Sequence, residues 1–338
     1  MLWRAMDDSP LRMGILGAAR IAPMALVRPA REVAGVEVRA LAARDPARAQ
    51  AFARRHGIPR VHASYEALLA DPELDAIYNP LPNSHHCAWT VRALEAGKHV
   101  LCEKPLASNA GEAARMGEAA ARAGRVLMEA FHWRYHPLAA RMLEVIASGE
   151  LGAVRHVEAT FCVPLLLPGD IRYRLDLAGG ATMDTGCYAI HVVRTLAGAE
   201  PEVVSAEARL ASPRVDRWMA AELRFPDGRS GRVECSLASA KLLAASARVV
   251  GDAGELRVTN PIAPQFWHRL RVTSARGRRS ERVPGDASYT HQLRAFLAAV
   301  REGAPFPTHA GDSVANMRVI DAVNTTTALG PRSGDGDN

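Results

Sequence analysis

Residues 76–106, AIYNPLPNSHHCAWTVRALEAGKHVLCEKPL, decide the fold. The run 76–79 is apolar and short enough for a buried strand, and residues 80–84 form a polar turn. A helix is expected over 86–96, followed by a second strand at 100–102 that runs into Glu103, Lys104 and Pro105. The unit predicts two parallel strands, and ligands bind at the carboxyl ends of such strands in an open α/β sheet.

The same alternation extends to both sides of this unit. We expect strands, in sequence order, at 11–16, 36–42, 60–62, 76–79, 100–102 and 126–129. The helices between them carry start signals at Asp45-Pro46, at Ser64 and at Asn109 with Glu112. Six strands alternating with helices predict a doubly wound parallel sheet, in a dinucleotide-binding domain over residues 1–132.

The pattern after residue 132 is one of alternating strands joined by turns. Strands are expected at 154–163, 203–210, 218–225, 231–239, 247–250, 255–258 and 269–272, and helices at 182–196, 289–302 and 311–325. This predicts an α+β domain over residues 133–330, built on a largely antiparallel sheet. We expect PRSGDGDN, residues 331–338, to be a disordered tail.

The composition suits a globular protein of two domains, with 338 residues of which 48% are hydrophobic and 23% charged. There is no apolar run of membrane-spanning length and no secretory signal, so we expect no membrane association. The five cysteines lack CxxC spacing and predict reduced thiols in a cytoplasmic protein. Because the histidines and cysteines also lack ligand spacing, we expect no metal.

The net charge of +6 raises the alternative of a nucleic-acid binder, based on the arginine-rich stretch 269–282. The basic excess is otherwise spread along the chain, and aromatic residues make up only 5%. These features favour a basic solvent face or a small anionic ligand, so we expect no nucleic acid as partner.

The turn after the first strand reads Gly17-Ala18-Ala19-Arg20-Ile21-Ala22, where a dinucleotide-binding turn would carry G-x-G-x-x-G. Gly17 permits the tight turn, and the small Ala19 allows backbone N–H groups to approach a pyrophosphate. We therefore place residues Gly17, Ala19, Arg20 and Ile21 at a cofactor. The alternative is a plain strand-to-helix turn.

The end of the second strand indicates which cofactor is bound. An acid at this point would bind the ribose 2′-hydroxyl of NAD, but positions 42 and 43 are alanines and Arg44 follows. An arginine suits a 2′-phosphate, so we expect NADP, with NAD as the alternative. Arg44 could otherwise be a solvated loop residue.

Taken together, the motifs resemble the Gfo/Idh/MocA family of NAD(P)-dependent oxidoreductases, and within it the branch of dihydrodiol dehydrogenase and glucose–fructose oxidoreductase. The matching residues are GILGAARIA at 14–22, PLPNSHH at 80–86, EKPL at 103–106, EAFHWRYHP at 129–137, GGATMDTGCYAIH at 179–191 and HAGDSVANMRVIDAV at 309–323. The resemblance implies an N-terminal Rossmann domain and a C-terminal domain whose open sheet forms a homo-oligomer. It also implies a cis bond between Lys104 and Pro105.

Residue by residue, the resemblance makes Lys104 the active-site lysine and Asp184 and Tyr188 the family's Asp-x-x-x-Tyr pair. We also place residues of the flanking motifs at the cofactor, namely Pro80, Asn83, His86, Glu103, Lys104, Trp133 and Arg134. His191, on the same helix as Tyr188, would line the substrate pocket with Lys104, Asp184 and Tyr188.

Hydride transfer between nicotinamide and a carbon that bears oxygen requires one proton to move at that oxygen. Tyr188 is a poor donor at its ordinary pKa of about 10 unless a cation favours its anion; Lys104 could do this, or bond the substrate oxygen directly. Asp184 and Tyr188, spaced i and i+4, share one helix face.

Each candidate also has a plainer interpretation. Lys104 could be a solvated strand end, Asp184 a helix N-cap and Tyr188 a core aromatic. His191 could be a packed helix histidine, Trp133 a core aromatic and Arg134 a surface cation, and Glu103 could serve only to orient its loop.

We predict a cytoplasmic, NADP-dependent dehydrogenase or reductase that interconverts C–OH and C=O in a small-molecule substrate, namely a sugar, polyol or cyclic diol. The alternative is an NADP-binding sensor or scaffold without catalysis. The presence of both Lys104 and Tyr188 argues against it.

Overall fold

A six-stranded parallel sheet forms the N-terminal part of the molecule. In the computed structural model, which describes residues 9–165, 167, 169–240 and 243–334, its strands lie in the order β3-β2-β1-β4-β5-β6. The strands are β1 (Leu11–Leu16), β2 (Val36–Ala42), β3 (Arg60–His62), β4 (Ala76–Asn79), β5 (His99–Cys102) and β6 (Leu127–Glu129). The strand order reverses between β1 and β4, which is where an open sheet of this kind forms its ligand crevice.

The helices after β2, β3 and β5 begin at their predicted caps, whereas the helix after β4 begins at Asn83, three residues before its predicted start. Asp45 accepts the backbone N–H groups of Ala47 and Arg48, and Ser64 and Asn109 each accept one amide. The helical segments are η1 (Pro23–Val27), α1 (Arg28–Glu32), α2 (Pro46–His56), α3 (Tyr65–Leu69), α4 (Asn83–Glu95) and α5 (Ala110–Ala123). The doubly wound parallel sheet is thus confirmed.

An eight-stranded sheet forms the C-terminal part, in the order β14-β13-β12-β11-β7-β10-β9-β8. Its strands are β7 (Val154–Cys162), β8 (Glu202–Ser212), β9 (Val215–Arg224), β10 (Ser230–Ser236), β11 (Ala244–Gly251), β12 (Gly254–Thr259), β13 (Arg269–Ser274) and β14 (Gly277–Glu281). All neighbours pair antiparallel except β7 with β10. This confirms the largely antiparallel sheet.

The sequence prediction missed the edge strand β14, whose letters GRRSE show no apolar alternation. The strand instead forms by backbone pairing with β13. On it, Arg279 pairs with Glu150, and Glu281 with Arg141.

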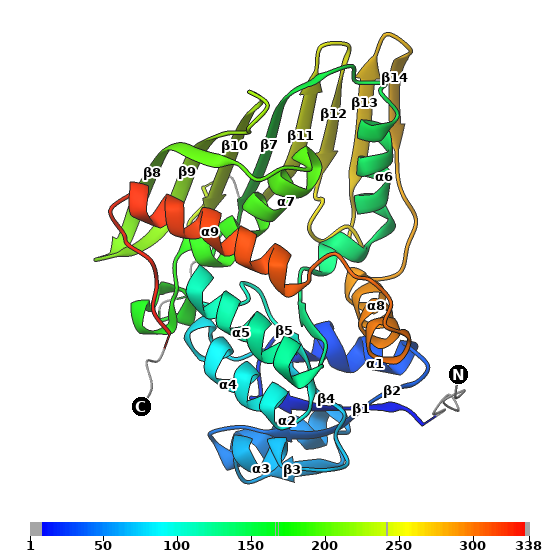
Figure 1. Ribbon diagram of the computed structural model, residues 1–338, viewed down its shortest axis with the longest axis vertical. Coiled ribbons are helices and arrows are strands. Elements are labelled where there is room, and N and C mark those ends of the chain that lie inside the picture. Colours follow the sequence, from blue (N-terminus) through cyan, green and yellow to red (C-terminus); the bar gives the residue numbers. More distant parts are fainter. Residues whose placement is uncertain (1–8, 166, 168, 241–242, 335–338) are drawn as a thin grey trace.

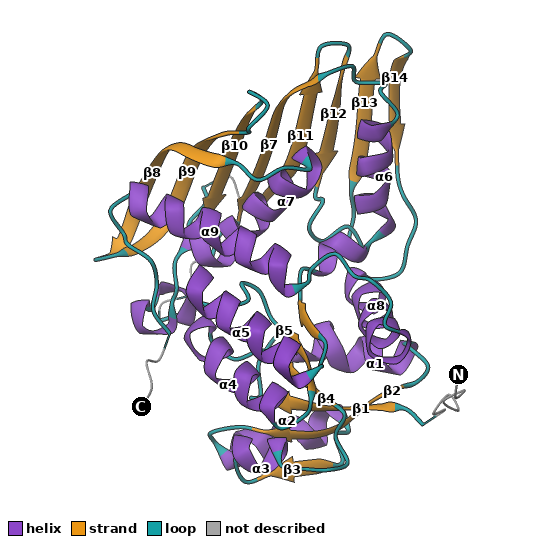
Figure 2. Cartoon of the chain, in the orientation of Figure 1, coloured by secondary structure: helices purple, strands orange, loops and turns teal. Residues whose placement is uncertain are grey.

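Helices cover one face of this sheet, and the other face carries no helix in the described part of the chain (Figures 1 and 2). The covering segments are η2 (His132–Tyr135), α6 (Pro137–Ala147), η3 (Ile171–Tyr173), η4 (Leu175–Leu177), η5 (Thr182–Gly186), α7 (Cys187–Ala197) and α9 (Ala310–Thr326). No helix among the described residues is long and apolar enough to cross a bilayer.

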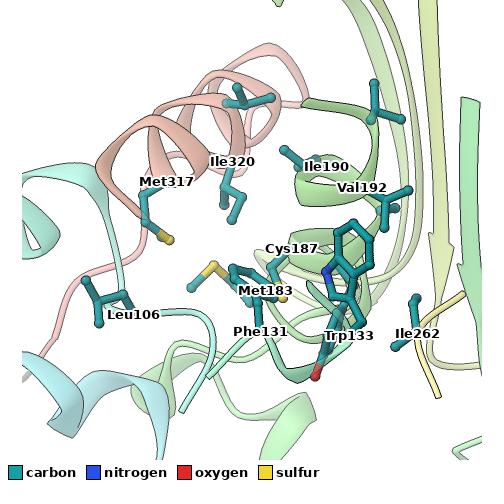
Figure 3. Packing of buried hydrophobic residues seen from close by; sticks show 14 of the residues in the cluster. Leu106, Phe131, Trp133, Met183, Cys187, Ile190, Val192, Ile262, Met317 and Ile320 are labelled. Atoms are coloured by element: carbon teal, nitrogen blue, oxygen red, sulfur yellow. The ribbon is translucent and has the colours of Figure 1, made fainter. Parts of the chain in front are cut away.

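The last two helices of the chain pack against elements that lie before residue 132. Helix α8 (Ser288–Glu302) places Leu293 and Phe296 in the same apolar cluster as β1 and η1. Helix α9 lies beside α5 in Figure 1, and its Met317 and Ile320 belong to a core shared by both sheets (Figure 3). The chain therefore returns to the N-terminal domain twice after leaving it.

Residues 331–334 also depart from the expected disordered tail. The side chain of Arg332 is buried and bonds to Asp216 and to the carbonyl of Gly179. The remaining tail positions, 335–338, lie outside the described residues.

Candidate active site

A lysine and an aspartate from the two domains meet at the carboxyl end of the parallel sheet. Strand β5 ends at Cys102, and Lys104 follows two residues later in a loop with the predicted cis bond to Pro105, which is confirmed. Lys104 Nζ donates to Asp184 Oδ1 at 2.9 Å and to the Asp184 carbonyl at 3.0 Å. The sequence placed these residues in one site, and the structure brings them into contact.

Each partner keeps the other ionised. Burial, the largest single effect, lowers the pKa of Lys104, but the charge of Asp184, its hydrogen bond and the other nearby acidic groups together outweigh burial, and the pKa is raised. Burial is also the largest effect on Asp184 and raises its pKa, but the charges and hydrogen bonds of Lys104 and Arg172 together outweigh it, and the pKa is lowered. The site therefore holds a fixed ammonium–carboxylate pair at neutral pH.

Tyr188 lies beside this pair. Tyr188 is on α7, four residues after Asp184. Lys104 Nζ lies 4.9 Å from the centroid of the Tyr188 ring. Only 5% of the residue is exposed. Burial raises the pKa of Tyr188 well above its usual value. The ammonium lies over the ring and is already paired with Asp184, so the expected lowering of the phenol pKa is not found.

Arg172 is a member of the site that the sequence did not reveal. Its Nε lies 3.0 Å from Asp184 Oδ2, so the carboxylate is held by a cation on each oxygen. Its Nη1 donates to Asp170, which also pairs with Arg20 of the first strand-to-helix turn. The segment 170–184 holds several arginines and aspartates, and spacing alone does not show which of them meet.

The first strand-to-helix turn has the shape that a dinucleotide requires. Gly17 has φ +83°, and its amide donates to the Ala42 carbonyl at 2.7 Å. Ala19 and Ile21 are half-buried, and their carbonyls accept the first amides of the following helix. Arg20 is 74% exposed in its side chain. A side chain at position 17 would be strained, so the tight turn requires glycine here, as in a dinucleotide-binding turn.

Two exposed arginines lie at the end of β2. These are Arg44 and Arg48, and Arg48 Nη2 donates to the Ala18 carbonyl of the first turn at 2.9 Å. The nearby Asp45 is occupied as the cap of α2. These residues fit an adenosine 2′-phosphate better than a free 2′-hydroxyl.

The residues of the 80–86 motif join the loops around the site. Asn83 Nδ2 donates to the Ala178 carbonyl at 3.0 Å, and Pro80 is buried. His86 is also buried, with its ring nitrogens 2.7 Å from the Leu81 carbonyl and 2.9 Å from that of Pro105. It therefore braces the lysine loop instead of facing a cofactor, which differs from its predicted role.

Glu103 likewise orients its loop. It accepts a hydrogen bond from Tyr78 Oη at 2.7 Å. Burial raises the pKa of Glu103, against the effects of Tyr78 and Lys104.

Trp133, predicted to lie at the cofactor, and His191, predicted to line the substrate pocket, are both buried and in contact with each other. Trp133 Nε1 donates to His191 Nδ1 at 3.0 Å, and His191 Nε2 faces Asp312 at 3.0 Å. Both residues are 1% exposed, and Trp133 packs among apolar side chains in Figure 3. Arg134, on the same 3-10 turn, is half-buried.

His132, the neighbour of Trp133 in the chain, lies beside Tyr188. Its ring lies 5.8 Å from that of Tyr188 and 4.0 Å from that of Tyr289 on α8. Its Nδ1 is 2.7 Å from Ser288 Oγ. Burial, followed by the charge of Lys104, lowers the pKa of His132 to about 3. The many histidines and aromatic residues at 130–137 indicated that this segment was important. They did not show which of its side chains face the site.

Models of one protein family match most of the chain. Residues 11–131 match the model of an oxidoreductase family with an NAD-binding Rossmann fold, and residues 139–257 match the GFO/IDH/MocA C-terminal domain. The D-xylose 1-dehydrogenase (NADP(+)) 2 of Haloferax volcanii is 38% identical over 95% of this chain and 98% of its own.

Two further proteins extend the comparison. The trans-1,2-dihydrobenzene-1,2-diol dehydrogenase of Danio rerio is 37% identical over 66% of each chain. Among solved structures, a 3-ketoreductase from Actinomadura kijaniata in complex with NADP and TDP-benzene superposes with a TM-score of 0.88. It is 30% identical and covers 94% of this chain and 98% of its own. The chain belongs to the Gfo/Idh/MocA family of NAD(P)-dependent oxidoreductases.

Proposed function

We propose that this protein transfers hydride between NADP and a carbon bearing oxygen in a sugar, polyol or cyclic diol. The observation that carries the proposal is the Lys104–Asp184 pair beside Tyr188, at the edge of the sheet where the dinucleotide turn also ends. The relatives support the substrate class, since they are named as sugar and diol dehydrogenases and a 3-ketoreductase.

The cofactor would lie along the turn of Gly17, Ala19, Arg20 and Ile21, with Arg44 and Arg48 at its 2′-phosphate. When bound, it supplies the hydride donor or acceptor. The chain itself provides the fixed charges that hold the phosphates, and a charge-assisted contact of this kind contributes about 1.5–3 kcal/mol.

Tyr188 is the residue that moves the proton. In carbonyl reduction its hydroxyl donates to the substrate oxygen as that oxygen gains negative charge, and the hydroxyl is later re-protonated from solvent. Tyr188 is in the neutral form that this direction requires, and because its raised pKa makes it a weaker acid, the transfer depends on the nearby ammonium of Lys104. Lys104, held as an ammonium by Asp184, stabilises the negative charge on the substrate oxygen and on the phenolate.

Incubating the protein with NADP⁺ and with NADPH, against a panel of sugars, polyols, nucleoside-diphosphate sugars and cyclic diols, tests this function. We expect at least one substrate class to change the absorbance of the reduced cofactor. Binding of NADPH without turnover of any panel member would instead support a sensor or scaffold.

We also propose that the bare face of the C-terminal sheet pairs two copies of the chain. Trp218 lies on this face, where its Nε1 donates to Glu234 and the guanidinium of Arg209 lies 4.8 Å from its ring centroid. A half-exposed tryptophan within a charged network is typical of an interface. Light scattering should show an oligomer that Trp218→Glu weakens, while Trp267→Glu, an exposed tryptophan outside the sheet, leaves it unchanged. A monomeric wild type would contradict this.

All five cysteines are buried, and reduced thiols of this kind support our proposal of a reducing cytoplasmic location.

A further inference from the structure

The helix that carries Asp184 begins beside the buried carboxylate of Asp216, on strand β9. The amide and the Oγ1 of Thr182 both donate to Asp216 Oδ2 at 2.7 Å. Gly180 has φ +130°, and a Cβ at this position would lie 2.2 Å from Asp216 Oδ1. Asp216 therefore fixes the start of η5, two residues before Asp184.

Asp216 is in turn compensated by the C-terminal segment. Its side chain and that of Arg332 are both 0% exposed, with Arg332 Nη2 3.3 Å from Asp216 Oδ1. Arg332 Nε also donates to the Gly179 carbonyl at 3.2 Å. An unpaired buried carboxylate is strongly unfavourable, so the position of Asp216 depends on this arginine.

The same segment is bound to the cofactor domain at the base of the lysine loop. Asn109 Nδ2 donates to the Arg332 carbonyl at 2.9 Å, and the Gly334 amide donates to Glu112 Oε1 at 2.7 Å. The other oxygen of Glu112 accepts the amide of Ser108 at 3.0 Å, four residues after Lys104. In Figure 1 the chain runs down from α9 to this junction in red.

These contacts form a closed path between the two catalytic partners. It runs from the Lys104 loop through Ser108 and Glu112 to residues 332–334, and from there to Asp216 and the start of the Asp184 helix. Lys104 and Asp184 belong to different domains, and their direct contact completes the path.

We propose that Arg332 is a positioning residue for the Lys104–Asp184 pair, acting through Asp216 and through the backbone of residues 332–334. The proposal rests on the proposed function in one respect, since it takes that pair to be catalytic. A merely structural role would lower the thermal stability without changing the geometry of the pair in the folded protein.

The state of the pair can be observed without any substrate, because the sequence contains only three lysines, Lys98, Lys104 and Lys241. In full-length protein with isotope-labelled lysine, the Lys104 ammonium should give a slowly exchanging NMR signal, assigned by its loss in Lys104→Arg. We expect Arg332→Gln to abolish that signal and Arg332→Lys, which keeps the charge, to restore it. Arg214→Gln is the matched control, because Arg214 also holds the C-terminal segment, at the Leu329 carbonyl, whereas the side chain of Asp216 bonds to Thr182 and Arg332.

Kinetics provide the second readout. Below the melting temperature, Arg332→Gln should lower kcat by about ten- to a hundredfold, the usual cost of a small misplacement, with the NADPH dissociation constant unchanged. If Arg332→Gln does not fold, the double variant Asp216→Asn/Arg332→Gln, which leaves no unpaired buried charge, takes its place with the same expected losses. A folded variant with an intact Lys104 signal and unchanged kcat overturns the proposal. If wild type turns over no panel member, the proposed function fails, and the NMR signal alone decides the positioning role.

Discussion

At the scale of single residues, the site depends on one carboxylate shared by two cations. Asp184 offers one oxygen to Lys104 and the other to Arg172. The lowered pKa of Asp184 means that its ion pairs are complete above pH 3.8 and are lost as pH falls through the lower folded value. The raised pKa of Lys104 means that its contribution is complete below pH 10.5 and is lost only above that value. The pair is therefore intact over the whole neutral range.

The arginines at the end of β2 lead to a prediction about cofactor preference. Arg44→Ala and Arg48→Ala should each weaken NADPH binding by about ten- to a hundredfold, the value of a charge-assisted phosphate contact, and leave NADH binding nearly unchanged. Fluorescence titration with both reduced cofactors measures this. Tighter NADH binding by the wild type would show that the 2′-phosphate is not recognised here.

Glu129, at the end of β6, leads to a prediction about pH. Burial raises the pKa of its carboxyl from 4.5 to about 8, and its Oε2 has no hydrogen-bond partner among the described residues. Between these pH values the folded protein holds a proton that the unfolded chain releases, so stability falls as pH rises from 4.5 to about 8.

Replacing the carboxyl with an amide removes this titration. The melting temperature of Glu129→Gln, relative to wild type, should therefore be higher at pH 9 than at pH 5. An equal difference at both pH values would mean that Glu129 does not titrate in this window.

At the scale of elements, most strands could be predicted from the sequence. The sequence did not show how the edge strand pairs or which domain each late helix packs against. Buried parallel strands such as β1 and β4 are short apolar runs bounded by glycine and proline, and the structure confirms them. The edge strand β14 was missed because its pairing depends on the backbone. The amphipathic pattern of α8 predicted a helix, but the pattern does not specify which domain that helix packs against.

The Gly-Gly that precedes the Asp184 helix belongs to the motif GGATMDTGCYAIH, but the sequence alone does not show why glycine stands at these two positions. The structure shows that the space beside them is filled by protein, since a Cβ on Gly179 would lie 2.5 Å from the Arg172 carbonyl and one on Gly180 would meet Asp216. The sequence separates these partners by up to 36 positions, so no local pattern could reveal them.

Gly180→Ala should consequently be among the most damaging small substitutions. We expect it to lower stability by about 3 kcal/mol or more, because an unfavourable positive φ adds to overpacking against Asp216. The matched control is Gly198→Ala, at φ +63° with open space around its Cβ, which should cost only about 1–2 kcal/mol. Equal losses in chemical denaturation would contradict the role of Asp216 at the helix start.

At the scale of the whole molecule, α8, α9 and residues 332–334 join the two domains. Helix α8 completes the cluster under β1, and α9 shares a core with α5 and α7. Because these elements cross between the sheets, unfolding one domain would expose apolar surface of the other.

We therefore expect the two domains to unfold in one transition. Trp89 lies in the cofactor domain and Trp218 in the C-terminal sheet. The fluorescence of two variants, one with Trp89 and one with Trp218 as the single tryptophan, would therefore follow the unfolding of each part. Their denaturation midpoints should coincide with each other and with loss of circular dichroism. Two separated midpoints would show that the crossing helices do not couple the domains.

The most direct test of the proposed catalytic role is single-turnover reduction of a substrate found in the panel, using Tyr188→Phe, Lys104→Met and the double variant. Tyr188→Phe keeps the ring and removes only the hydroxyl, so the rate should fall about 10²–10⁴-fold, the usual contribution of a general acid, while NADPH binding stays unchanged. Lys104→Met should cost at least as much, and the double variant little more than the worse single one, because the two groups act as a unit. A Tyr188→Phe rate above about a third of the wild-type rate would contradict this account, since general acid catalysis contributes far more than threefold.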